Sequence, residues 1–511
     1  MQAWSDGYMT DVEYTHGYYA ELNPLRARLA LLNAGHACPE VRTACELGFG
    51  QGLSVNLHGA ATATEWYGTD FNPVQAAFAR ELAGDPVRAA RLFDDAFDAF
   101  CRRDDLPDFD FIGLHGIWSW VSDANRAVIA EFIRRKLKVG GVLYISYNTQ
   151  PGWAAIAPLR DLLTGFSDSM TAPGLDTAQR IEASLAFAER LMASGALFGK
   201  SNPAALEELK RLATQPRNYL AHEYFNRDWT PMPFSRMAEW MGSLKLQFAG
   251  SAHPIDHLDV LNLNDDQARL LGEIPDRHLR EAARDLMVNQ RFRRDYWIRG
   301  ARRLSPLEQA ERQRAERVVL AEPAAAVKLV AQGPLGEGNL KEEIYRPILD
   351  ALADHQPRQV GEIERTVAAS GIGLAQVLQA LTILAGNGAL HPAQDEQAVR
   401  QARAATDALN VRLCRQARYA ADVAYLASPV TGGGIPAGRF DQLFLLARGA
   451  GLAAPGEWAQ YASALLDAQG QRLVKDGKTI DAGQPQLAAL NERAAEFAEL
   501  RLPMLAALGI A

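Results

Sequence analysis

The stretch from residue 41 to residue 70 constrains the fold of this chain more than any other. Residues 41–47 read as a short buried strand, 48–52 (GFGQG) as a glycine turn, and 53–63 as a helix, and a second strand at 65–69 leads to an acid. This is the order of a nucleotide-binding βαβ unit. Glycine lets backbone approach a ligand closely, and an acid about 20 residues further on can accept both hydroxyls of a ribose. The pattern predicts a cofactor site at Gly48, Gly50, Gly52 and Asp70.

An acid just before the glycine turn indicates which cofactor fits. Residues 46–52, ELGFGQG, match the form E/D-x-G-x-G-x-G of class I methyltransferases. A dinucleotide places its pyrophosphate at the turn and the helix N-terminus, where a carboxylate would repel it. S-adenosylmethionine (SAM) has a zwitterionic methionine and a sulfonium in that place. Glu46 therefore favours SAM as the cofactor.

The next strand ends supply further candidates for the cofactor site. Phe71 directly follows the ribose acid, and we expect its ring to cover a face of the adenine. The third strand, 90–93, ends in two adjacent acids, Asp94 and Asp95. In this fold the acid after the third strand usually meets the adenine amino group. Either acid fits, and we favour Asp95, with Ala96 beside it.

An aromatic cluster follows the fourth strand, 109–114. His115, Trp118 and Trp120 stand at its carboxyl end, where open α/β sheets bind ligands. We predict that His115 contacts the cofactor and, with Trp118, belongs to the catalytic site. The two tryptophans fit either the core or the walls of a channel for an amine acceptor. Upstream of the first strand, Tyr14 is predicted to fold over the cofactor pocket and give a polar edge to the substrate.

The fifth strand, 142–148, leads into residues 149–153, TQPGW. Together with Tyr14-Thr15, ELGFGQG, GTDFNP and LHGIWSWV, the block SYNTQPGW resembles bacterial class I SAM-dependent methyltransferases that carry a methyltransferase regulatory domain. The resemblance continues through LAHEY (220–224) and NQRFR (289–293) to LASP (426–429), whereas residues 165–215 match poorly. Characterised relatives of this kind are rickettsial lysine methyltransferases that act on outer-membrane proteins. The resemblance implies a Rossmann-like core, a SAM cofactor and a protein substrate.

The domain organisation is read from pattern and linkers. Residues 1–262 are predicted to be a SAM-binding α/β domain with a helical insertion at about 161–215, which fits a lid, a homodimer contact or a substrate platform. Residues 263–330 read as a charged helical region whose basic run at 291–299 fits a solvated helix face or a surface for an acidic protein. Residues 335–395 are predicted to be winged-helix-like, and 396–511 a mostly helical regulatory or substrate-recognition domain containing a second winged-helix-like unit.

Composition excludes some partners. The formal net charge of −8 argues against general nucleic-acid binding, and the third helix of the winged-helix-like unit, 374–384, has no lysine or arginine. No apolar run approaches the roughly 18 residues of a membrane span, and the N-terminus lacks the pattern of a signal peptide. The four scattered cysteines fit a reducing compartment. His253 and His257 are separated by Pro254, which argues against a metal-binding helix face. We therefore expect a cytoplasmic protein without a metal.

The sequence leaves the acceptor open. A SAM-dependent protein lysine N-methyltransferase fits best, because an amine desolvated beside a sulfonium loses its proton without a strong base. A sugar, lipid or other small metabolite is the alternative acceptor, and a hydroxyl there would need a base such as His115. A third interpretation of the function is a scaffold that binds SAM weakly and acts by interaction. The intact motif residues argue against it.

Overall fold

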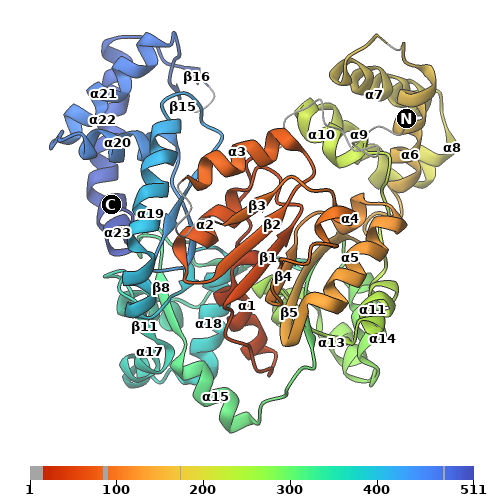
Figure 1. The fold of residues 1–511 in the computed structure, drawn as a ribbon, viewed down its shortest axis with the longest axis horizontal. Helices are drawn as coiled ribbons and strands as arrows, with labels where there is room; N and C mark the ends of the chain where they lie inside the picture. Colours follow the sequence, from red (N-terminus) through yellow and green to blue (C-terminus); the bar gives the residue numbers. More distant parts are fainter. Residues whose placement is uncertain (1–14, 85–89, 173, 476–477) are drawn as a thin grey trace.

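The computed structural model describes residues 15–84, 90–172, 174–475 and 478–511. A seven-stranded sheet in the order β3-β2-β1-β4-β5-β7-β6 occupies its centre (Figure 1). The strands are β1 (Thr43–Leu47), β2 (Glu65–Thr69), β3 (Arg91–Phe93), β4 (Phe109–Leu114), β5 (Leu137–Asn148), β6 (Leu246–Ser251) and β7 (Phe292–Arg299). Strands β1 to β5 pair in parallel and β7 runs antiparallel between β5 and β6. This confirms the predicted Rossmann-like α/β core.

Helices connect the parallel strands, as parallel pairing requires. They are α2 (Leu53–Ala61), α3 (Pro73–Ala83), the short α4 (Phe97–Phe100) and α5 (Asp123–Lys136), and α1 (Pro24–Asn33) precedes the sheet. The middle strands are apolar on both faces because helices cover both, and all but one residue of β4 is buried. Asn72 caps α3 by accepting from the Val74 N–H, with Pro73 at the first helical position. The carboxyl ends of β1, β2 and β4 thereby meet at one edge.

The basic run at 291–299 is a strand, and the helix predicted there is wrong. Strand β7 places Tyr296 beside Tyr144 of β5, and Trp297 beside Phe248 of β6. Its charges are internal, since Arg293 pairs with Asp295 two residues on, both almost fully buried. Oppositely charged residues that pair inside a sheet have the same composition as a solvated helix face. The sequence pattern alone therefore indicates a helix. The sheet therefore closes only at residue 299, beyond the boundary predicted at 262.

The helical insertion follows β5 and stands to the upper right in Figure 1. It has a core of its own, which includes Trp153, Leu163 and Leu185. Its helices are α6 (Ala157–Met170), α7 (Thr177–Ala193), α8 (Leu197–Ser201), α9 (Pro203–Ala213) and α10 (Arg217–Tyr224). Arg291, just before β7, fixes this unit to the sheet by pairing with Glu208 at 2.5 Å.

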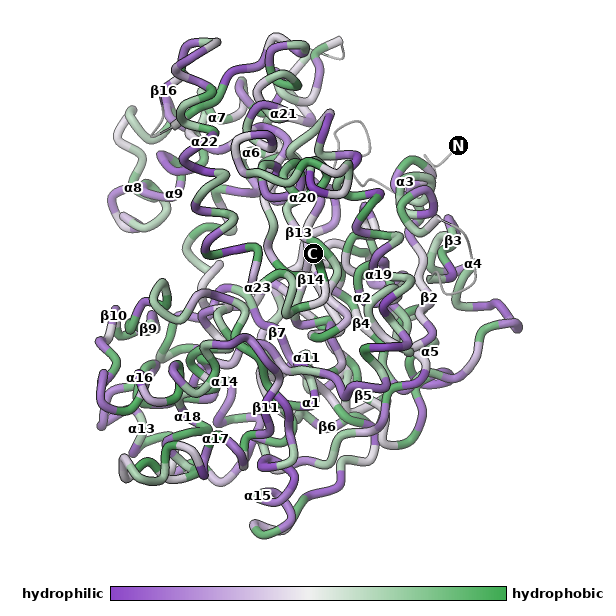
Figure 2. The backbone as a smooth tube through the Cα atoms, turned by 90° about the vertical axis from the view of Figure 1, so that its left-hand side faces the viewer, coloured by the Kyte–Doolittle hydropathy of each residue, from purple (hydrophilic) through white to green (hydrophobic). Residues whose placement is uncertain are grey.

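Short helices precede and follow β6 and β7 in the chain and lead on to the next unit. They are α11 (Phe234–Ser243), α12 (Asp259–Asn262), α13 (Asp265–Gly272), α14 (Arg277–Met287) and α15 (Pro306–Ala315). Helix α15 is largely hydrophilic and lies at the lower end of the molecule in Figure 2. The charged helical character predicted for residues 263–330 thus holds for α13, α14 and α15.

The unit predicted to be winged-helix-like follows, with helices close to the three predicted ones. These are α16 (Glu342–Ala351), α17 (Val360–Val367) and α18 (Leu374–Gly386), beside a sheet of β8 (Arg317–Leu320), β11 (Arg358–Gln359) and β12 (Leu390–Pro392). A hairpin of β9 (Val330–Gly333) and β10 (Gly336–Asn339) precedes α16. Strand β8 lies before the predicted start at 335, so this unit takes its central strand from the region assigned to the middle segment.

The C-terminal unit packs directly on the cofactor domain. Its elements are α19 (Glu396–Gln416), β13 (Tyr425–Ser428), β14 (Gly433–Pro436), α20 (Arg439–Gly449), α21 (Pro455–Ala468), β15 (Val474–Lys475), β16 (Lys478–Thr479), α22 (Gln484–Glu496) and α23 (Leu502–Ala507). Leu57 of α2 belongs to the same buried cluster as Leu426 and Ile435. Pro503 sits in the first turn of α23, where proline is tolerated.

Among the residues that the structure describes, no single helix is long and apolar enough to cross a membrane. One sharply bent pair, Val360–Ser370 with Leu374–Gly386, passes the same test by length and composition. Both helices contribute buried side chains to the core of the winged-helix-like unit.

Candidate active site

The glycine turn after β1 is built for close approach of a ligand. Gly48, Gly50 and Gly52 all have positive φ, between 58° and 74°. A Cβ on Gly48 would come within 2.3 Å of the Ile117 side chain, and one on Gly52 within 2.4 Å of Ala79. Only glycine fits such positions without strain. The turn thus brings backbone to the N-terminus of α2 at the edge where the strands end.

Asp70 closes this turn from the end of β2. Its Oδ2 accepts a hydrogen bond from the Gly50 N–H at 2.8 Å, and its Oδ1 accepts from the Asn72 N–H at 3.0 Å. Burial raises the pKa of Asp70 to about 6, although both backbone donors oppose that shift. Each carboxylate oxygen can accept more than one hydrogen bond. The geometry therefore leaves Asp70 able to accept ribose hydroxyls while it holds the loop.

Glu46, at the end of β1 just before the turn, is a buried acid with one carboxylate oxygen that lacks a hydrogen-bond partner among the described residues. It is 2% exposed, and its Oε2 has no hydrogen-bond partner within the described ranges. Burial and the nearby Asp70 charge raise the pKa of Glu46 well above its usual value. A buried acceptor without a partner is costly, and a cation placed beside it would relieve that cost. The site as folded therefore suits a ligand with an ammonium group, as the methionine part of SAM has.

The predicted adenine residues lie at the ends of β2 and β3. Phe71 is partly buried directly after Asp70. Asp95 pairs with Arg103 at 3.0 Å, and its carbonyl accepts from the Thr69 hydroxyl at 2.5 Å. Asp94 pairs instead with Arg80 at 2.6 Å in a more exposed position. Ala96 is exposed at the start of α4. The topology brings these residues to the cofactor edge, and their contacts with adenine stay predictions.

His115 is held in a stack of rings. The Tyr19 ring lies 3.5 Å from it, nearly parallel, and His115 Nδ1 is 2.8 Å from the Tyr144 hydroxyl. Desolvation lowers the pKa of His115 to about 4, and the opposing effect of Glu21 is smaller. The imidazole is thus neutral at physiological pH. Sequence reasoning missed Tyr19 and Tyr144, although Tyr19 ends an aromatic run, which is a usable signal.

The aromatic residues beyond β4 divide into two groups. Trp118 is fully buried, with its ring 5.4 Å from Trp240 and edge-on to it, and Tyr147 is buried with its hydroxyl donating to Asp295 at 2.8 Å. The structure therefore favours the core alternative for Trp118 over the catalytic role. Trp120 is partly exposed, 6.4 Å from the partly exposed Trp229. Tyr14 lies outside the described residues, and its role over the cofactor pocket stays a prediction.

The C-terminal unit packs against the N-terminal segment and α2, which carry part of the candidate site. The turn at 431–434 is fully buried, and the Asn23 side chain donates to the Thr431 carbonyl at 3.1 Å. A Cβ on Gly433 would meet the Tyr18 hydroxyl at 2.4 Å. The neighbouring Tyr19 N–H donates to Ser54 at the start of α2 at 2.9 Å. The glycine triplet at 432–434 is therefore a packing element between the N-terminal segment and α2.

No group of three or more His, Cys, Asp or Glu side chains suited to a metal ion occurs within residues 15–84, 90–172, 174–475 and 478–511. The strand order, the positive-φ glycine turn, the Oε2 of buried Glu46, which has no partner in the described part of the chain, and the acid Asp70 at the end of β2 together define a class I SAM-dependent methyltransferase.

Comparison with known proteins agrees with this class. Residues 216–299 match the family model described as a predicted methyltransferase regulatory domain. The chain is 40% identical over 512 residues to the uncharacterized protein sll1526 of Synechocystis, covering 99% of each. It is 29% identical over 294 residues to the uncharacterized protein RP789 of Rickettsia prowazekii, covering 55% of this chain and 51% of that one. PKMT2 from Rickettsia typhi in complex with AdoHcy has the same fold, with a TM-score of 0.69 at 17% identity, covering 97% and 99% of the two chains.

The chain belongs to the family of class I SAM-dependent methyltransferases that carry a methyltransferase regulatory domain. The regulatory domain matched at 216–299 includes β6 and β7, which are strands of the central sheet. It therefore shares its sheet and its core with the cofactor domain.

Proposed function

We propose that this protein transfers a methyl group from SAM to the side-chain amine of lysine in a protein. The observation that carries the proposal is the state of His115, an imidazole at the carboxyl end of β4. It is neutral, stacked under Tyr19 and bonded to Tyr144, with its pKa lowered to about 4. So weak a base suits an acceptor that needs none. The solved structure of similar fold from Rickettsia typhi is named PKMT2, which supports the same choice.

The residues of this chain perform binding, alignment and exclusion of water. SAM supplies an activated methyl group on a sulfonium when it is bound. Glu46 would accept the ammonium of its methionine part, Asp70 would accept its ribose hydroxyls, and the glycine turn allows its close approach. In-line displacement needs the amine aligned with the methyl carbon and the sulfonium sulfur, and shielded from water. This alignment supplies most of the rate enhancement. Removal of water also favours the neutral amine, because desolvation disfavours a charged ammonium.

A partly exposed aromatic pair marks the acceptor side in this proposal. Trp229 lies beside Trp120, and the adjacent Thr230 N–H donates to the Ser119 carbonyl at 2.8 Å. Aromatic faces suit a lysine stem that is apolar along its length and cationic at its tip. A reducing, cytoplasmic setting belongs to the same proposal, since the four cysteines are free.

The acceptor is identified by mass spectrometry. The full chain, incubated with methyl-labelled SAM and a lysate of its source cell, is expected to place label on lysine side chains of protein. The same lysate with labelled SAM but without the added chain is the matched control for labelling by other enzymes. Label found on a small molecule or on oxygen, with none on lysine, would refute the lysine acceptor while leaving the SAM site intact.

Replacement of His115 separates amine from hydroxyl acceptors. For an amine, His115→Asn is expected to lower kcat by less than about tenfold, because no dedicated base is lost. Tyr144→Phe removes the same hydrogen bond but keeps the imidazole, so the two variants should behave alike. A general base at His115 predicts instead a loss of roughly 10²–10⁴-fold for His115→Asn alone. Rates measured across pH distinguish the two cases.

A further inference from the structure

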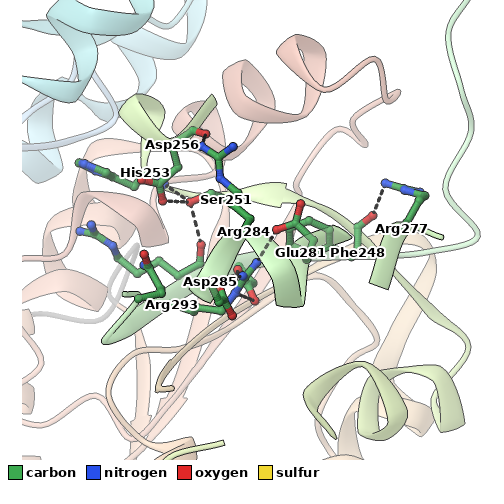
Figure 3. Close-up of polar contacts among 12 residues, drawn as sticks. Phe248, Ser251, His253, Asp256, Arg277, Glu281, Arg284, Asp285 and Arg293 are labelled. Carbon is green, nitrogen blue, oxygen red and sulfur yellow. Dashed lines mark hydrogen bonds and ion pairs between the residues drawn. The ribbon is translucent and has the colours of Figure 1, made fainter. Parts of the chain in front are cut away.

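A cavity of about 140 Å³ lies inside the regulatory domain, between β6, β7 and α14 (Figure 3). All of its lining residues fall between 248 and 295, so the matched domain at 216–299 contains it completely. A cavity of about 150 Å³ holds a molecule the size of benzene. This one is lined mainly by charged and polar side chains, so its natural content is polar.

The lining has more negative than positive charge. Arg293 is surrounded by three carboxylates, with Asp285 at 2.5 Å, Glu281 at 2.9 Å and Asp295 at 3.0 Å. The other two guanidiniums of the lining pair with acids outside it. Arg294 contacts Glu21 at 2.8 Å, and Arg284 contacts Asp259. One guanidinium therefore faces three carboxyl groups at the centre of the cluster.

One of these carboxylates is incompletely paired. Asp285 is 3% exposed, and its Oδ2 has no hydrogen-bond partner among the residues described. Arg293 cannot easily turn to satisfy it, because its guanidinium is fixed over the Phe234 ring at 4.3 Å and is shared with Asp295 and Glu281. A buried acceptor left without a donor is unfavourable unless a ligand supplies one.

We propose that this cavity binds a small organic cation with a primary ammonium group, whose N–H donors satisfy Asp285. An ammonium supplies both the missing charge and the missing donors, and has no acceptor of its own to leave unpaired. The assignment is independent of the acceptor of methyl transfer, because the cavity is separate from the glycine turn and Asp70.

Contacts on both sides of the cavity lead to the candidate active site. Asp295 accepts from the Tyr147 hydroxyl at 2.8 Å, near the end of β5. Arg294 pairs with Glu21, two residues after the Tyr19 that stacks on His115. A ligand that rearranges the ion pairs around Arg293 would therefore also affect Tyr147 and the segment of Tyr19, which lie next to the candidate active site. The bound cation is a regulator in this assignment.

Ethanolamine and ethylammonium are the probes, with tetramethylammonium as a cation that has no N–H donor. Burial raises the pKa of Asp285 to about 7, so binding is measured at pH 8, where its carboxylate is ionised. At constant ionic strength, the primary amines are expected to raise the thermal unfolding midpoint of the full chain saturably, and tetramethylammonium to leave it unchanged. An equal shift with tetramethylammonium, or none with either amine, overturns the proposal.

Two variants test whether the amines bind in the cavity beside Asp285. Asp285→Asn should weaken amine binding at least tenfold, whereas Asp266→Asn, an exposed acid on α13, should leave it unchanged. Should Asp285→Asn fail to fold, Val288→Phe fills the cavity without altering its charges and is expected to abolish binding. Unaltered amine binding in Val288→Phe, or saturable binding of Mg²⁺ in place of the amines, would also refute the assignment.

Discussion

A chain ending at residue 262 is expected to fail to fold. The cofactor motifs all precede that point, but β7 at 292–299 is hydrogen-bonded between β5 and β6. Without it, β6 loses the strand that joins it to the sheet, the edge of β5 is left unpaired, and the buried Leu143 and Tyr144 lose their neighbours Trp297 and Tyr296. Far-UV circular dichroism should show no cooperative thermal transition for this fragment. A cooperative transition with intact SAM binding would contradict the role assigned to β7.

A single substitution tests the same strand within the full chain. Trp297 is fully buried and packs on Phe234 and Phe248, at 5.7 and 5.4 Å between ring centroids. Trp297→Ala is expected to destabilise the sheet by about 3–5 kcal/mol, the usual cost of removing a buried aromatic ring. The matched control is Leu286→Ala, an apolar side chain of α14 that is 70% exposed and should change stability little. Urea unfolding followed by circular dichroism compares the two.

The first half of the sheet could be predicted because its signals are local. A glycine turn between a strand and a helix, and an acid after the next strand, depend on residues within a span of about 30 positions. Strand β2 is observed over the residues that were predicted, and β1 begins two residues later than predicted. The turn glycines need positive φ whatever surrounds them. Local backbone chemistry therefore sufficed for the cofactor loop.

Strand β7 escaped sequence reasoning because its partners are distant. Arg293 and Asp295 look like a solvated pair until β5, β6 and α14 enclose them, when Tyr147 and Asp285 complete the network. Likewise, nothing near His115 in sequence indicates that Tyr19, far upstream in the chain, would stack on it. Charge and aromaticity identify the residue types at such positions, whereas tertiary packing decides whether they face solvent, core or ligand.

Asp70 is expected to dominate cofactor affinity. Its carboxylate is in place to accept ribose hydroxyls, and such charge-assisted hydrogen bonds are worth more than neutral ones. Asp70→Asn keeps the size of the side chain but presents an NH₂ group either to the ribose or to the Gly50 N–H, which now donates to Oδ2 at 2.8 Å. One donor must then face another donor. SAM binding should weaken by about 2–3 kcal/mol, or roughly 30- to 160-fold.

Asp266→Asn is the matched control, because Asp266 is an exposed acid on α13 that pairs with Arg269. Titration calorimetry should find SAM affinity close to that of the unaltered chain in this variant and strongly reduced in Asp70→Asn. Thermal unfolding without SAM reports whether Asp70→Asn has disturbed the loop itself, since the hydrogen bonds from Gly50 and Asn72 exist without ligand. Equal affinity in the two variants would remove Asp70 from the ribose site, and Glu46 would then be the acid to test next.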